Sequence, residues 1–150
     1  IGDLEKLTLD AQRGYIVQRS SYVASQSSVN LDIQWQGFTR GIFGQGLFMI
    51  KTSGVGDLFI NTFGAIDKHD LLPGEKLIVD NFHLVAFSDT CSYEVKTLGG
   101  LKEFALSGEG LVVEVTGPGE VLLQTKNLAE FADWLWSFYE PKIRAMMGSR

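Results

Sequence analysis

The chain has 150 residues, of which 45% are hydrophobic and 21% charged, and its formal net charge is -5. This length suits one domain with a sizeable core, and the composition excludes a disordered chain. The basic residues are spread singly, whereas nonspecific binding of nucleic acid needs clustered Lys and Arg. Nucleic acid is therefore not the partner that the composition predicts.

Cys91 is the only cysteine of the sequence, which excludes an internal disulfide and fits a reducing compartment. The sequence shows no apolar run of membrane-spanning length and no signal peptide. The chain begins at Ile1 instead of a methionine, so we expect a fragment or a processed product.

Short strands separated by glycine turns are predicted for the first 126 residues. Residues 29–33 alternate apolar and polar side chains with the period of a strand. Further short apolar runs of strand character are 47–50, 58–60, 77–79, 84–87, 111–113 and 121–123. Helical spacing is absent before residue 127. The pattern predicts an all-β fold of the β-sandwich, jelly-roll or barrel type.

A glycine-punctuated phrase occurs twice, at residues 44–62 and 108–125. Eighteen positions align when Ser53 is treated as an insertion, and seven of them are identical. Four of the identities are glycines, which indicates shared turns and bulges rather than a shared ligand. The glycines expected at turns are Gly44, Gly46, Gly54, Gly56, Gly74, Gly108, Gly110, Gly117 and Gly119.

The repeat predicts a β-domain over residues 1–126 made of two similar units. The flanking pairs Ile16/Ile78 and Val23/Val85 extend the correspondence upstream at a constant offset. The units then cover about 12–62 and 74–125, with the turn residues Pro73-Gly74 at the join.

A C-terminal helical segment is predicted over residues 127–147. Asn127 is a suitable N-cap, with Glu130 three residues later as in a capping box. An apolar face follows, and Pro141 is expected to end or kink the helix.

This helix holds more aromatic residues than a single apolar stripe can accommodate. Two interpretations are open: the helix plugs the end of the β-structure, or it contacts a partner or a second subunit. Acidic residues on its polar face make a membrane-surface role less favoured. The residues expected to dock are Phe131, Trp134, Trp136 and Tyr139.

Residues for catalysis or metal binding are few. The two histidines, His69 and His83, are fourteen residues apart, and His83 near Asp80 is the best fragment of a jelly-roll metal site. A satisfied structural histidine is the more frequent case, so we expect no metal and no cofactor. Cys91 with His83 lacks a third residue to orient the pair, and a buried Cys91 is expected.

The glycine-rich stretches do not match nucleotide-binding motifs. Each glycine pair of the repeat precedes an apolar strand-like run, and no Gly-x-x-x-x-Gly-Lys-Ser/Thr loop is present. The Gly-x-Ser-x-Gly elbow of a serine hydrolase is also absent. Acidic residues such as Asp67, Asp70, Glu109 and Glu120 are expected on solvated surfaces.

Several segments together resemble the family named for altered inheritance of mitochondria. They are Gly44-Gln45-Gly46-Leu47-Phe48, residues 72–80 (LPGEKLIVD), His83-Leu84-Val85-Ala86-Phe87, residues 108–111 (GEGL), residues 116–119 (TGPG) and Gln124-Thr125. The resemblance covers about residues 2–140. It implies a fold similar to the tryptophan RNA-binding attenuation protein, repeated in tandem, and a ring-like homo-oligomer, with a trimer expected.

The same resemblance sets what we expect of function. Family members carry a further N-terminal stretch, and no catalytic residues of the family can be carried over to this chain. A eukaryotic member would be mitochondrial and a prokaryotic member cytoplasmic. The distant attenuation protein binds RNA and tryptophan, but kinship of fold does not transfer function.

We therefore expect a non-catalytic, oligomeric β-scaffold that binds itself and possible protein partners. One alternative is a module that binds a small molecule or nucleic acid between subunits. A second alternative is a metal-dependent jelly-roll enzyme that uses His83 and Asp80.

Overall fold

The computed structural model describes residues 2–36, 47–97 and 111–147. The described elements are β1 (Leu4–Leu9), β2 (Tyr15–Gln18), the 3-10 helix η1 (Arg19–Ser21), β3 (Tyr22–Ser25), β4 (Val29–Gln36), β5 (Leu47–Gly54), β6 (Gly56–Asn61), β7 (Ile66–Leu71), β8 (Lys76–Asp80), β9 (Leu84–Ser88), β10 (Ser92–Thr97), β11 (Leu111–Thr116), β12 (Gly119–Gln124) and the helix α2 (Leu128–Met147). The predicted all-β fold with a C-terminal helix is confirmed.

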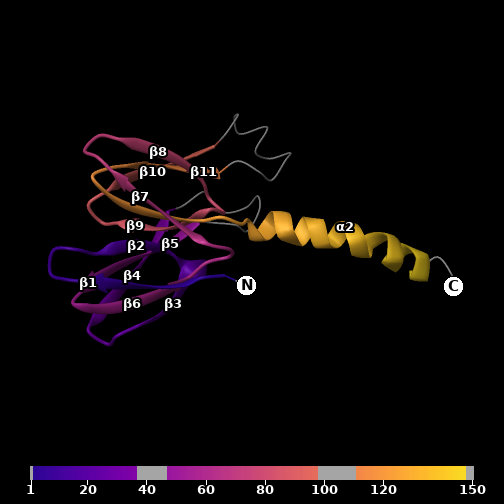
Figure 1. The fold of residues 1–150 in the computed structure, drawn as a ribbon, viewed down its shortest axis with the longest axis horizontal. Coiled ribbons are helices and arrows are strands. Elements are labelled where there is room, and N and C mark those ends of the chain that lie inside the picture. The colour runs from indigo at the N-terminus through magenta and orange to yellow at the C-terminus, as the bar shows by residue number, and fades with distance from the viewer. Residues whose placement is uncertain (1, 37–46, 98–110, 148–150) are drawn as a thin grey trace.

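The strands form three antiparallel sheets. A six-stranded sheet has the order β4-β5-β2-β9-β12-β7, and two three-stranded sheets have the orders β1-β6-β3 and β10-β11-β8. Figure 1 shows the strands gathered in one body, from which α2 extends with the C-terminus at its far end. The likeness to the attenuation protein stays a prediction.

Two hydrophobic clusters fill the β-body. One gathers around Phe87, Val113 and Val121, and the other around Leu58, Ile60 and Val85. Strand β9 supplies residues to both clusters, and its five residues are all buried. It lies inside the six-stranded sheet, where β2 and β12 pair with its two edges, and its side chains pack into the two clusters.

The first six strands pair in the same order as the last six. The pairs β1·β6, β3·β6, β4·β5 and β2·β5 have counterparts six strands later in β7·β12, β9·β12, β10·β11 and β8·β11. The pair β2·β9 joins the two sets. This pairing order groups β7 with the later strands, whereas the turn at Pro73-Gly74 lies between β7 and β8. The division into units at that turn stays a prediction.

The glycine turns are partly within the described ranges. Gly54 and Gly74 have φ of 105° and 78°, a conformation that other residues adopt with strain, so both fit the predicted turn role. Gly117 instead packs closely, because a Cβ there would lie 2.5 Å from the Leu72 carbonyl oxygen. Gly44, Gly46, Gly108 and Gly110 lie outside the described residues.

Strand β4 follows the predicted alternation but buries less than expected. Val29 is buried, whereas both Leu31 and Ile33 are exposed. Strand β4 is an edge of the six-stranded sheet, and the described residues leave 43% of Leu31 and 66% of Ile33 exposed.

Candidate functional site

The helix α2 begins at the predicted cap. The Asn127 Oδ1 atom accepts hydrogen bonds from the backbone N–H groups of Ala129 at 2.8 Å and Glu130 at 3.3 Å. Two of the four N–H groups that a helix start leaves unpaired are thereby satisfied. The cap fixes where the chain leaves the β-body after β12.

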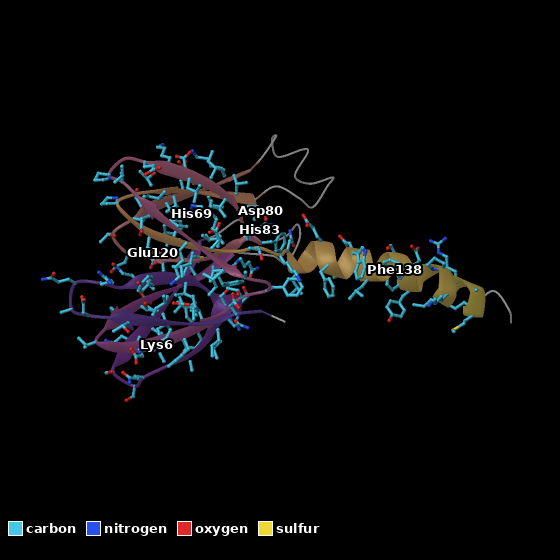
Figure 2. The ribbon with its side chains drawn as sticks, viewed as in Figure 1. Lys6, His69, Asp80, His83, Glu120 and Phe138 are labelled. Carbon is cyan, nitrogen blue, oxygen red and sulfur yellow. The ribbon has the colours of Figure 1, made fainter. Side chains whose placement is uncertain are left out.

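Phe131 connects α2 to the β-body. Its ring lies 5.2 Å from that of Phe63, centroid to centroid, and 5.8 Å from that of Trp134. Trp134 in turn meets Phe138 edge-on at 4.9 Å. These three residues of α2 form one aromatic row along the helix, and Figure 2 shows Phe138 well away from the body. Phe131 is half-buried, whereas Trp134 and Phe138 are more than half exposed.

Trp136 and Tyr139 lie on a different side of α2. Both are more than half exposed, and they are three positions apart in the sequence, so they neighbour each other on the helix surface. The structure therefore does not bring the four predicted docking residues onto one face. It divides them between two aromatic surfaces.

One side of α2 is a polar stripe, and the two aromatic surfaces meet on the opposite side across apolar residues. Glu130, Asp133, Ser137, Glu140 and Arg144 follow one another at intervals of three or four residues, which places them on one side. Within it, the Arg144 guanidinium donates to the Glu140 carboxylate at 2.6 Å. The rest of the helix surface is apolar apart from Lys142.

The expectation that the helix plugs the β-structure is wrong. None of the 20 residues of α2 is buried, and the helix points away from the strands (Figure 1). Only its first turns lie beside the body, through Phe131 and the cavity described below. The helix also continues through Pro141 to Met147 instead of ending there.

Phe138 is not among the four residues that the sequence predicts to dock. Its spacing of four residues from Trp134 was the available signal, since side chains at that interval meet on one helix face. Ile143, Met146 and Met147 extend the exposed apolar surface toward the C-terminus.

The histidines have local structural partners. The His83 Nδ1 atom lies 2.7 Å from the Gln124 carbonyl oxygen, and the Asp80 carboxylate accepts from the Phe82 N–H at 2.8 Å. His69 lies on β7 with its Nε2 atom 2.9 Å from the Asp67 carboxylate. Within residues 2–36, 47–97 and 111–147, no group of three or more His, Cys, Asp or Glu side chains is arranged to hold a metal ion.

Cys91 lies in the core, as the sequence analysis predicts. Its thiol donates to the Pro118 carbonyl oxygen at 3.4 Å, and burial raises the thiol pKa. His83 precedes β9 and Cys91 follows it, so the two residues lie at opposite ends of that strand. The pair does not form a nucleophile and base.

A cavity of about 560 Å³ lies where β2 meets the later strands. It is lined by the carboxylates of Asp10, Asp70, Asp89 and Glu120 and by Arg13, among others. The Tyr15 hydroxyl donates to the Glu120 carboxylate at 3.3 Å. Burial first, and the Glu120 charge second, raise the Tyr15 pKa. The site suits hydrogen-bond donors and positive charge, and Figure 2 shows Glu120 at the end of the body away from α2.

A second cavity, of about 660 Å³, lies at the base of α2. Its polar lining consists of carboxamides and hydroxyls, including Gln18, Asn81 and Gln124, and its apolar lining includes Phe82 and Leu128. The carboxamides are already engaged, since Gln18 donates to the Asn81 carbonyl oxygen at 3.1 Å and Gln124 to that of Phe82 at 2.6 Å. None of the described residues that line this cavity carries a charge.

No helix in the described part of the chain combines the length and the apolar character needed to cross a membrane.

Comparisons with known proteins relate the β-body to a family. A family model described as mitochondrial biogenesis AIM24 matches residues 1–126. An uncharacterised protein of Streptococcus pyogenes serotype M6 is 32% identical over 126 residues, which are 83% of this chain and 50% of that protein. The chain thus spans about half the length of that relative.

A solved structure agrees with this relationship. The crystal structure of a Streptococcus pyogenes protein is similar with a TM-score of 0.77 and 31% identity, over 91% of this chain and 60% of the other. These comparisons indicate no catalytic family. The chain belongs to the mitochondrial biogenesis AIM24 family.

Proposed function

We propose that this protein is a non-catalytic, homo-oligomeric β-scaffold whose helix α2 presents aromatic surfaces to other subunits or partner proteins. The observation that carries the proposal is the exposure of α2, which buries none of its 20 residues. A trimer is the expected oligomer.

The chemistry of α2 supports a contact with protein. Trp and Tyr are favoured at the centres of protein interfaces, and Trp134, Trp136 and Tyr139 are each more than half exposed. Burying one large apolar side chain contributes about 1.5–3 kcal/mol. Covering several of these residues would therefore stabilise an assembly.

The positions of the candidate catalytic groups support a non-catalytic role. His83, Asp80 and Cys91 each have a structural hydrogen-bond partner, and His83 and Cys91 lie at opposite ends of β9. The Cys91 thiol has a raised pKa, which disfavours the reactive thiolate.

Sedimentation velocity at micromolar concentration tests the proposal. We expect the wild-type protein to be an oligomer and the double variant Trp134→Ala/Tyr139→Ala to dissociate at concentrations where the wild type stays assembled. Asp133→Ala, on the polar stripe of the same helix, is the matched control and should behave as wild type. A monomeric wild type, or unchanged association in the double variant, would overturn the role of α2.

A further inference from the structure

The cavity at the base of α2 is built from many separate parts of the chain. Its walls come from β2, η1, the ends of β6 and β12, the turn between β8 and β9, and the first two turns of α2. Its volume of about 660 Å³ falls within the range of about 300–1,000 Å³ that is typical of small-molecule sites. The cavity is therefore large enough to hold an organic ligand.

Ser21 places a buried hydroxyl in this wall without a partner. The residue is 3% exposed, and its Oγ atom forms no hydrogen bond with the described residues. The atom is not sealed in by protein, so it opens on the cavity. Because buried polar side chains nearly always have a partner, the Ser21 hydroxyl indicates a partner that sits in the cavity.

Two carboxamides in the same wall leave one further donor and one acceptor. Asn81 is 8% exposed, and its carbonyl oxygen and Oδ1 each accept from the Gln18 Nε2 atom at 3.1 Å. The Asn81 Nδ2 donor and the Gln18 Oε1 acceptor have no partner among the described residues, and protein does not enclose either atom. The contact between the two side chains thus fixes a free donor and a free acceptor in position.

The lining of the cavity discriminates against charge. Its polar side chains, within the part of the chain that the structure describes, are carboxamides and hydroxyls. A charged ligand would lose its hydration there without gaining an opposite charge, which is costly. The cavity therefore favours an uncharged ligand over one with a phosphate or carboxylate group.

The apolar part of the wall suits a flat ring. Phe82 is half-buried there, and its ring has no aromatic partner among the described residues, whereas the Phe63 ring packs on Phe131. The helix contributes Ala129 and Ala132, whose short side chains leave space. An aromatic side chain of this kind favours a planar ring, since two rings pack well in offset or edge-on contact.

We propose that this cavity binds an uncharged small molecule in which a flat ring carries an amide group. An amide offers an N–H donor to the Gln18 Oε1 atom and a carbonyl acceptor to the Asn81 Nδ2 atom. The Ser21 hydroxyl supplies a further hydrogen bond, and Phe82 contacts the ring. The amide is either part of the ring, as in a lactam, or a carboxamide attached to it. This site goes beyond the proposed scaffold and does not depend on the oligomer.

Isothermal titration calorimetry with four probes tests the ligand class. Nicotinamide carries a neutral carboxamide on a ring, and uracil carries the amide within the ring. Nicotinate replaces the amide by a carboxylate, and pyridine lacks it. We expect nicotinamide or uracil to bind at least about tenfold more tightly than nicotinate and pyridine. The tighter of the first two identifies the source of the amide. Equal affinity across the set, or no binding, would overturn the proposal.

NMR spectra of the side-chain N–H groups locate the bound probe. Addition of the tighter amide probe should shift the carboxamide signals of Asn81 and Gln18. The carboxamide signal of Gln12, which lines the acidic cavity at the other end of β2, should stay unchanged. A shift of Gln12 without a shift of Asn81 would place the ligand elsewhere and overturn the site.

Ser21→Ala separates a ligand contact from a structural one. Because the Ser21 hydroxyl has no partner in the free protein, its removal should leave the melting temperature at or above that of the wild type. Binding of the amide probe should weaken about tenfold. Ser88→Ala is the matched control: Ser88 is 8% exposed, and its Oγ atom accepts from the Glu120 N–H at 3.0 Å, away from this cavity. This variant should lose stability and keep its affinity.

Asn81→Asp tests the donor in the same cavity. The substitution keeps the acceptor for Gln18 but replaces the Nδ2 donor by an oxygen that repels the carbonyl group of an amide. Binding should weaken by a larger factor than in Ser21→Ala, and circular dichroism checks that the variant folds. Ser21→Ala decides the question if it does not. A loss of stability in Ser21→Ala with unchanged affinity would show that the cavity holds only water, and would overturn the proposal.

Discussion

At the scale of single residues, the Glu114 carboxylate bridges lysines on two neighbouring strands. Its carboxylate accepts from the ammonium groups of Lys76 at 2.7 Å and Lys96 at 2.8 Å. These hydrogen bonds lower the pKa of Glu114 to about 2. The three residues come from β8, β11 and β10, so the contact spans the whole sheet.

This arrangement predicts an acid-dependent loss of stability. In the unfolded chain Glu114 regains its ordinary pKa of 4.5, so the folded state favours the carboxylate. Wild-type protein should exceed Glu114→Gln in free energy of unfolding above pH 4.5. The difference should shrink as the pH falls toward about 2, where the folded carboxylate also becomes protonated. Urea denaturation at several pH values measures it.

Glu94→Gln provides the matched control for this prediction. Glu94 lies on the same sheet, forms one ion pair among the described residues, with Lys96 at 3.4 Å, and is well exposed. Its removal should leave the stability close to wild type, as exposed ion pairs contribute little. A difference between wild type and Glu114→Gln that is the same at pH 7 and pH 2 would contradict the assigned cause.

At the scale of elements, α2 is expected to depend on its cap more than on the β-body. Because no residue of α2 is buried, tertiary packing contributes little to holding its first turn. Asn127→Ala removes the two cap hydrogen bonds and should cost the helix about 1 kcal/mol. Hydrogen exchange should show faster opening of the first turn of α2 while the protection of the strands is unchanged.

Asn127→Asp is the conservative comparison for the cap. Its carboxylate keeps the acceptor and adds a negative charge at the positive end of the helix, so protection should be retained. Equal protection of α2 in Asn127→Ala and wild type would show that other contacts hold the helix start.

The sequence predicted the elements better than their registers. Apolar runs such as 84–87 and 121–123 became strands because each is short, rich in strand formers and bounded by turn residues. The cap at Asn127 was also predicted, since the capping interaction is local. Both successes concern interactions between residues close together in the chain.

The doubled phrase shows where local reasoning fails. The alignment paired Thr52 with Thr116, but Thr52 lies opposite Tyr15 while Thr116 lies opposite Lys76. Ile16 corresponds to Ile78, so Tyr15 corresponds to Leu77. Leu77 lies opposite Val115, and Val115 is therefore the residue that corresponds to Thr52. Ser53 is therefore not an insertion. Side-chain burial on the two faces of a strand sets the register, and shared glycines do not report it.

The sequence also did not predict where α2 lies relative to the β-body. Its aromatic residues suggested either a plug or a contact surface, and composition alone does not distinguish the two. The choice depends on whether the β-body leaves an open end of matching shape. The described strands instead fill their cores with their own side chains, such as Phe87 and Leu122.

At the scale of the whole molecule, the pairing of β2 with β9 joins strands β1–β6 to strands β7–β12, and the two sets of strands share their cores. Ile16 and Met49 from the first set belong to the cluster around Phe87. Val85 and Leu122 from the second set belong to the cluster around Leu58. Each core is therefore incomplete without residues from the other set, and neither set is expected to unfold alone.

This interlocking predicts that damage to one core is felt in both. Phe87→Ala removes a fully buried ring and should cost about 3–5 kcal/mol. Hydrogen exchange at fixed protein concentration should then show the amides of β6 and β12 losing protection by the same free energy. Asp133→Ala, on the polar stripe of the exposed helix α2, is the control and should leave both strands unchanged. If β12 loses protection while β6 keeps it, the two sets are independent folding units, and the pairing of β2 with β9 is only a contact between them.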